Sequence, residues 1–164
     1  VEEIIELSGT SKGSFYHYFD GKDALLSTLS SLFDEKYEEL TGLLTPEMTA
    51  MEQLLFLNRE LFHMIEDSIS LDLLARLYST QLTTNGEKHL LDHNRIYYKL
   101  LRKIIAKGQA EGQLSSRSNV NEMVKLYALC ERALLYDWCL CAGEYALTEY
   151  SAKVLPGFLS SFLP

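Results

Sequence analysis

A short stretch near the start of the chain carries side chains that can bind nucleic acid. In a helix, Phe15 and Phe19 are four residues apart, so both point into one small core. The opposite arc would then expose Lys12, Gly13, Ser14, Tyr16, His17 and Tyr18. Gly13 lets the backbone approach a groove, while the lysine and hydroxyl groups can contact phosphates and base edges. The arc therefore predicts a surface that enters the major groove of DNA.

The flanking residues predict the elements that would position this arc. Residues 1–7 read as the end of a helix, and Gly9 fits the left-handed position that closes it. Ser11 is a good N-cap for the short helix that ends near Phe19. A long helix follows over about residues 22–44. This order of helix, tight turn, short helix and supporting helix is a helix-turn-helix arrangement.

The charge of the chain opposes a DNA-binding role. The net charge is −8, and residues 1–43 hold three lysines against nine carboxylates. A reader with only Lys12 and Lys22 near the groove forms few ion pairs with phosphates, so its DNA affinity should depend weakly on salt concentration. DNA binding must therefore rest on local geometry.

The rest of the chain is predicted to be helical. Apolar residues recur at helical spacing after Pro46, first around Met51–Ile65 and Leu71–Tyr78, then over about 88–110, 119–143 and 147–162. No segment shows the alternation typical of a strand. We predict an all-α protein with two domains, a partial helix-turn-helix domain over 1–44 and a ligand-binding and dimerisation domain over 45–164.

The last two helices carry more apolar surface than one face requires. Two apolar stripes run along residues 119–143, and residues 147–162 add more. A symmetric four-helix bundle between two chains would cover this surplus, although a central hairpin in a monomer would also do so. The homodimer interface is predicted at Val124, Leu135, Cys139, Val154, Leu155, Phe158, Leu159 and Phe162.

Other chemistry has little support in the sequence. His89 and His93 lie one helical turn apart near Asp92, but no third ligand is evident, and a solvated pair explains them. The three cysteines form no even disulfide framework. No catalytic constellation can be singled out, so we expect neither an enzyme nor a cofactor or metal. Without a signal peptide or a membrane-spanning apolar run, a cytoplasmic protein is expected.

The stretch over residues 4–26 closely resembles the DNA reader of the TetR family of bacterial repressors. Its core is Ser11-Lys12-Gly13-Ser14-Phe15-Tyr16, and Thr10 stands where the family usually has valine. Looser similarity covers residues 108–114 and 135–138. The resemblance implies DNA contacts from the six residues of the arc and from Lys22. In the family another helix precedes the reader, so we expect residues upstream of Val1.

The resemblance also implies a ligand pocket among the central helices. The candidate lining residues are Phe62, His63, Tyr78, Tyr97, Tyr98, Tyr127, Glu131 and Trp138, although each aromatic residue could equally be plain core. Glu131 stands out, because a carboxylate between Tyr127 and Leu134 needs a partner if it is buried.

The function implied by the resemblance is a dimeric repressor of a palindromic operator, released by a small hydrophobic or aromatic effector. A helical small-molecule carrier or partner-binding protein without DNA function is the alternative.

Replacement of Tyr16 tests the predicted reader. In the full-length protein, Tyr16→Ala should weaken operator binding by about 1–3 kcal/mol, because one specific contact is lost. Phe15 and Phe19 hold the fold, so circular dichroism should not change. Unaltered operator affinity with an intact fold would show that Tyr16 does not contact the groove.

Overall fold

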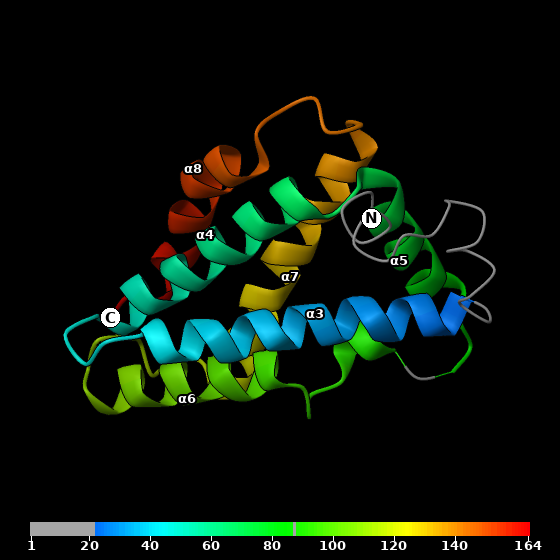
Figure 1. The fold of residues 1–164 in the computed structure, drawn as a ribbon. Coiled ribbons are helices and arrows are strands. Elements are labelled where there is room, and N and C mark those ends of the chain that lie inside the picture. Colours follow the sequence, from blue (N-terminus) through cyan, green and yellow to red (C-terminus); the bar gives the residue numbers. More distant parts are fainter. Residues whose placement is uncertain (1–21, 87) are drawn as a thin grey trace.

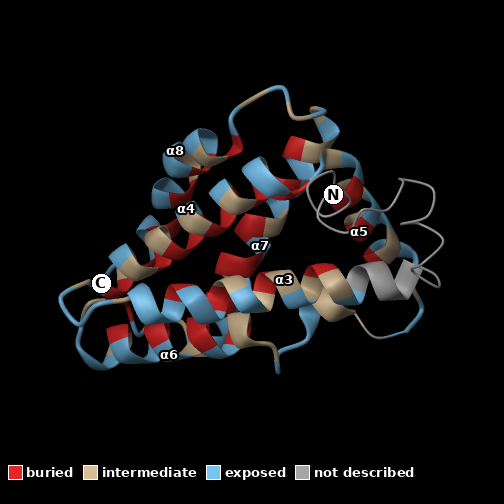
Figure 2. Ribbon diagram, viewed as in Figure 1, coloured by how far each residue is buried: buried red, intermediate tan, exposed pale blue. Residues whose placement is uncertain are grey.

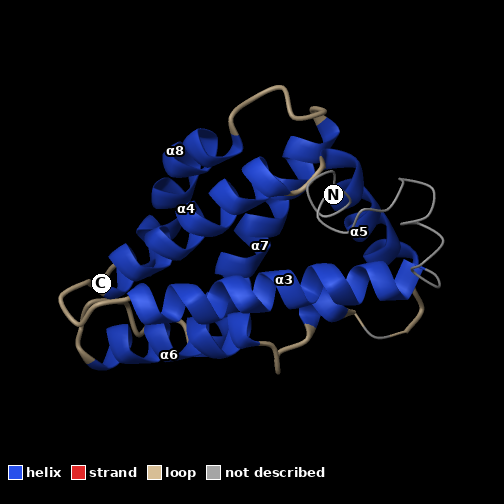
Figure 3. Cartoon of the chain, in the orientation of Figure 1, coloured by secondary structure: helices blue, strands red, loops and turns tan. Residues whose placement is uncertain are grey.

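The computed structural model describes residues 22–86 and 88–164, with side chains described from Ser27 onward. This part of the chain folds into helices joined by loops, and no strand occurs in it (Figure 1, Figure 3). The elements in chain order are α3 (Lys22–Leu43), α4 (Ala50–Ser68), α5 (Leu71–Thr83), η1 (His89–Leu91), α6 (Ile96–Ala110), α7 (Val120–Leu140), α8 (Leu147–Leu159) and η2 (Ser160–Phe162).

Capping residues fix where several helices begin. The Thr49 side chain accepts a hydrogen bond from the Glu52 backbone N–H, and Glu52 accepts one from the Thr49 N–H, which forms a capping box at α4. Ser70 and Asn119 cap α5 and α7 with their side-chain oxygens. These polar side chains satisfy backbone N–H groups that have no partner within their own helix.

The start of α8 is capped by another helix. The Glu66 carboxylate on α4 accepts hydrogen bonds from the backbone N–H groups of Leu147 and Thr148, at 2.9 and 3.0 Å, and from the Thr148 hydroxyl at 2.7 Å. A carboxylate at this position also opposes the positive end of the helix dipole. Glu66 therefore fixes how α8 lies along α4.

The core lies where α4, α6 and α7 meet. α4 packs against α3, α6 and α8, while α7 packs against α5, α6 and α8. Figure 2 shows the buried residues along the inward faces of these helices. At Gly108 on α6 a Cβ atom would lie 2.6 Å from the Ala50 Cβ, so α6 approaches the start of α4 as only glycine allows. This close packing makes the helical body one unit.

The observed helices differ from the predicted ones at the start of α6. The helix expected over about 88–110 begins only at Ile96, because residues 92–95 form a turn in which Asp92 accepts a hydrogen bond from the Asn94 N–H. A proline inside a helix commonly kinks or ends it, but α8 continues past Pro156 to Leu159. The all-α fold class is confirmed. The boundary predicted after residue 44 stays a prediction.

Candidate ligand-binding site

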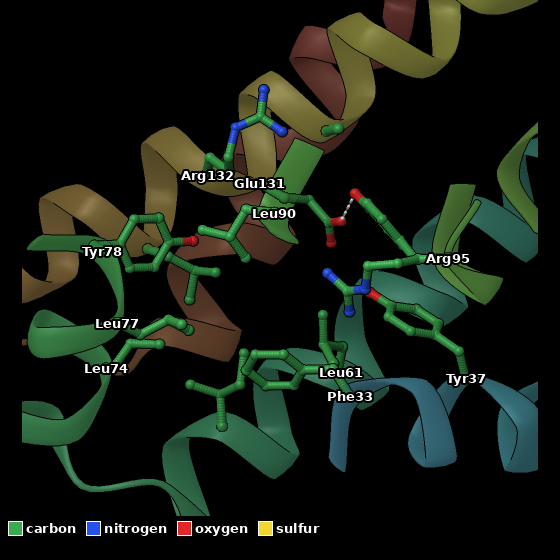
Figure 4. Close-up of a pocket in the computed structure, with 14 residues that line it drawn as sticks. Phe33, Tyr37, Leu61, Leu74, Leu77, Tyr78, Leu90, Arg95, Glu131 and Arg132 are labelled. Carbon is green, nitrogen blue, oxygen red and sulfur yellow. Dashed lines mark hydrogen bonds between the residues drawn. The ribbon is translucent and has the colours of Figure 1, made fainter. Parts of the chain in front are cut away.

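A small pocket lies in the helical body between α3, α4, α5, α6 and α7, and its cavity volume is about 60 Å³ (Figure 4). Its lining residues are Phe33, Tyr37, Leu61, Ile65, Leu74, Leu77, Tyr78, Leu90, Arg95, Tyr97, Ala128, Glu131, Arg132 and Leu135. The lining is thus mostly apolar and aromatic, with a carboxyl and two guanidinium groups. Such a combination is typical of sites that bind a largely apolar small molecule and orient it through a few polar groups.

Glu131 on α7 is the most buried charged residue of this pocket, with 4% of its surface exposed. Its Oε1 accepts a hydrogen bond from the Tyr97 hydroxyl at 2.5 Å, and its Oε2 accepts one from Asn58 Nδ2 at 2.7 Å. The Asn58 Oδ1 in turn accepts a hydrogen bond from the Ser151 hydroxyl at 2.6 Å. These four residues, which we call the Glu131 network, join α4, α6, α7 and α8.

The surroundings of Glu131 change its ionisation. Burial raises the pKa of its carboxyl to about 7, although the hydrogen bonds from Tyr97 and Asn58 and the charge of Arg132 act in the opposite direction. Both protonation states are therefore populated near neutral pH. Burial next to this carboxyl also raises the pKa of the Tyr97 hydroxyl well above its ordinary value.

Arg95 links the pocket to α3. Its side chain is 9% exposed, and its Nη2 lies 3.0 Å from the Asp34 Oδ1 in an ion pair. Two residues further on, the Tyr97 ring packs against the Tyr37 ring with centroids 5.0 Å apart. Both contacts join the beginning of α6 to α3, the helix that directly follows residues 1–21. A displacement of Arg95 or Tyr97 would thus change contacts with α3.

An apolar stripe on α7 is exposed beside the face that lines this pocket. Leu129, Tyr136 and Leu140 follow helical spacing and are exposed by 49%, 49% and 67%. On α8, Tyr150 and Phe158 are exposed as well. Tyr136 and Leu140 line a surface hollow together with Leu82 of α5, and exposed apolar side chains that gather in this way are typical of a protein–protein contact.

One family model matches the beginning of the chain. The family model described as "Bacterial regulatory proteins, tetR family" matches residues 1–29. The N-terminal stretch is thus similar to the DNA-binding part of the regulators that this model describes. Among curated proteins, no relative matches the chain.

A solved structure has a fold similar to that of the helical body. The transcriptional regulator FadR from Bacillus subtilis, solved in complex with stearoyl-CoA, superposes with a TM-score of 0.72 at 20% sequence identity. The match covers 98% of this chain and 87% of FadR. The helical body therefore has the same fold as a regulator that holds a long-chain acyl compound.

The structure brings three of the predicted pocket residues together at the pocket, namely Tyr78, Tyr97 and Glu131. Phe62, Tyr98, Tyr127 and Trp138 are buried in the core but do not line it. Three of them instead anchor backbone carbonyls, because the side chains of Tyr98, Tyr127 and Trp138 donate hydrogen bonds to Leu90, Leu54 and Tyr145.

His63 does not line the pocket. It lies on the solvent face of α4 and approaches Asp67 at 3.3 Å, while Leu61 and Ile65 on the other face line the pocket. Phe33, Tyr37 and Arg95 line the pocket but were not among the predicted lining residues. Phe33 and Tyr37 lie four residues apart on α3, a spacing typical of one helix face, but only the tertiary structure shows which helices that face meets.

The interface residues predicted on α7 and α8 differ in how far the chain itself covers them, and the interface stays a prediction. Five of them are covered within the protomer itself, namely Val124, Leu135, Leu155, Leu159 and Phe162. Cys139 and Val154 are half-buried, and only Phe158 is exposed. The reason is that α5, α6 and α8 surround α7 and cover both predicted stripes. Among the exposed apolar residues of the described part, Leu129, Tyr136 and Leu140 form a third stripe on α7.

The DNA contacts predicted for Lys12, Gly13, Ser14, Tyr16, His17 and Tyr18 lie outside the described residues. Lys22 is the first residue of α3, and its predicted contact is also outside the described side chains. Within the described part, no group of three or more His, Cys, Asp or Glu side chains forms a metal-binding cluster. No helix in this part is long and apolar enough to cross a membrane.

Replacement of Glu131 tests the ionisation of the buried carboxyl. An unfolded chain releases this proton near pH 4.5, whereas the folded chain keeps it until about pH 7. Between these values folding takes up a proton, so the free energy of unfolding falls as pH rises, by about 3 kcal/mol in total. Glu131→Gln should remove this fall and be the more stable form at pH 8.

Urea unfolding at pH 5 and pH 8 measures the difference. Glu149→Gln removes an exposed carboxyl on α8 and serves as the control, which should follow the wild type. An equal pH dependence in the wild type and Glu131→Gln would show that Glu131 titrates in its ordinary range.

Proposed function

We propose that this TetR-family regulator is a repressor that binds a palindromic operator as a homodimer and is released by a small, largely apolar effector held in the pocket. The observation that carries the proposal is that α3, the helix following the reader, itself supplies part of the pocket wall through Phe33 and Tyr37. The complex of FadR with stearoyl-CoA supports an effector with a long apolar part. Because a bacterial operator lies in the cytoplasm, we expect the protein to act there.

The size of the cavity suggests how an effector would act. Pockets for small molecules commonly enclose about 300–1,000 Å³, whereas this one encloses about 60 Å³. An effector can therefore enter only if the lining helices move apart. The effector would favour a state in which α3 is displaced from α6. Because α3 follows the predicted DNA reader, this displacement would lower the affinity for the operator.

The homodimer is proposed to form through the exposed stripe of α7 together with the exposed face of α8. Tyr136 and Leu140 are the large apolar side chains at the end of that stripe. Two copies related by a twofold axis would bury this surface against itself. The dimer would hold two readers at a fixed separation, which is how helix-turn-helix proteins select two half-sites.

An operator search by in vitro selection tests the regulator function. The full-length wild type should enrich a sequence with two inverted half-sites, and it should sediment as a dimer at micromolar concentration. Tyr136→Glu/Leu140→Glu should sediment as a monomer and bind the selected operator at least tenfold more weakly, because four carboxylates would enter the interface.

Leu91→Glu is the matched control, since Leu91 is an exposed leucine on η1, next to α3 and away from α7. This variant should stay dimeric. A wild type that is monomeric at tens of micromolar would contradict the dimer. Failure to enrich any palindrome would favour a helical carrier without DNA function.

A further inference from the structure

Two groups of opposite charge face each other in the pocket without forming an ion pair. Figure 4 shows the Glu131 carboxyl and the Arg95 guanidinium directed toward the middle of the pocket, while the Arg132 guanidinium points away from it. The ion pair of Arg95 is with Asp34 on α3, and Glu131 is held by Tyr97 and Asn58. A group placed between the two would meet an acceptor on one side and a donor on the other.

Both groups retain unused hydrogen-bonding capacity. A carboxylate offers about four acceptor positions, and Glu131 uses two of them. A guanidinium has five N–H donors, and Arg95 uses three, two toward Asp34 and one toward the His89 carbonyl. The Tyr78 hydroxyl also points into the pocket, and it has no hydrogen-bond partner among the described residues (Figure 4).

When Glu131 is ionised, the charges around the pocket cancel, which selects against an ionic ligand. Arg95 is neutralised by Asp34, and Arg132 lies close enough to Glu131 to lower the pKa of its carboxyl. A ligand carboxylate or ammonium would therefore enter a buried site without a free counter-charge, which is costly. A purely apolar ligand would leave the Glu131, Arg95 and Tyr78 groups facing hydrocarbon, which is also unfavourable.

We propose that the effector carries a neutral secondary amide, whose carbonyl accepts a hydrogen bond from Arg95 and whose N–H donates one to Glu131. In a trans amide the C=O and N–H point to opposite sides of a planar bond, as the two facing groups require. The apolar parts of the molecule lie against Leu61, Ile65, Leu74 and Leu77. This inference rests on the proposed function and specifies the chemical class of its effector.

A matched series of ligands tests the amide, with binding to the full-length wild type measured by isothermal titration calorimetry. The probes are N-butylhexanamide, butyl hexanoate, decanoic acid and decylamine, which have similar length and differ in the polar group. The amide should bind at least tenfold more tightly than the ester, because a site built around a donor and an acceptor rejects an analogue that lacks one of them. The acid and the amine should bind more weakly than the amide.

Arg95→Met should weaken binding of the amide and of the ester alike, by at least tenfold, because both carry the carbonyl that Arg95 would bind. Arg102→Met is the control, since Arg102 lies on α6 outside the pocket and donates to the His93 carbonyl. This variant should bind both ligands as tightly as the wild type does. The series on the wild type decides the proposal even if Arg95→Met does not fold.

An ester that binds as well as the amide, an acid or amine that binds most tightly, or no binding by any probe would overturn the amide. These outcomes are separate from the operator selection, which reports on the regulator function without any ligand.

Discussion

The burial of the Glu131 carboxyl is the constraint on which the arrangement of the helices depends. A carboxyl removed from water costs several kcal/mol unless hydrogen bonds replace the lost hydration. Tyr97 from α6 and Asn58 from α4 supply these bonds, and Ser151 from α8 fixes the Asn58 side chain. Because each donor comes from a different helix, the polar groups are satisfied together only when α4, α6, α7 and α8 have their observed register.

The same constraint connects the pocket with the helix that follows the DNA reader. Tyr97 donates to Glu131 and packs against Tyr37 of α3, while Arg95 pairs with Asp34 of α3. A ligand between Glu131 and Arg95 would lie beside both contacts. Its binding energy could then act on the position of α3 through a few named side chains, as the proposed coupling between effector and operator requires.

The positions of the helices and the importance of Glu131 could be predicted from the sequence, but the residues that contact Glu131 could not. Helical periodicity and capping residues are local, so α3, α4, α5, α7 and α8 were located closely. Glu131 was singled out because a carboxylate among apolar residues needs partners, but Asn58 lies 73 positions away in the chain, and only the tertiary structure brings it close. Leu135 and Leu159 are buried within the chain itself, because apolar spacing does not reveal whether the same chain or a partner covers a stripe. The dimer interface stays a prediction.

The most direct test of this account is the titration of Glu131 by carboxyl ¹³C NMR, with its signal assigned by its loss in Glu131→Gln. The account predicts a midpoint at about pH 7, because the carboxyl is buried at the junction of four helices. A midpoint at about pH 4.5, the ordinary value for a glutamate in water, would show that the carboxyl is solvated and would contradict the account.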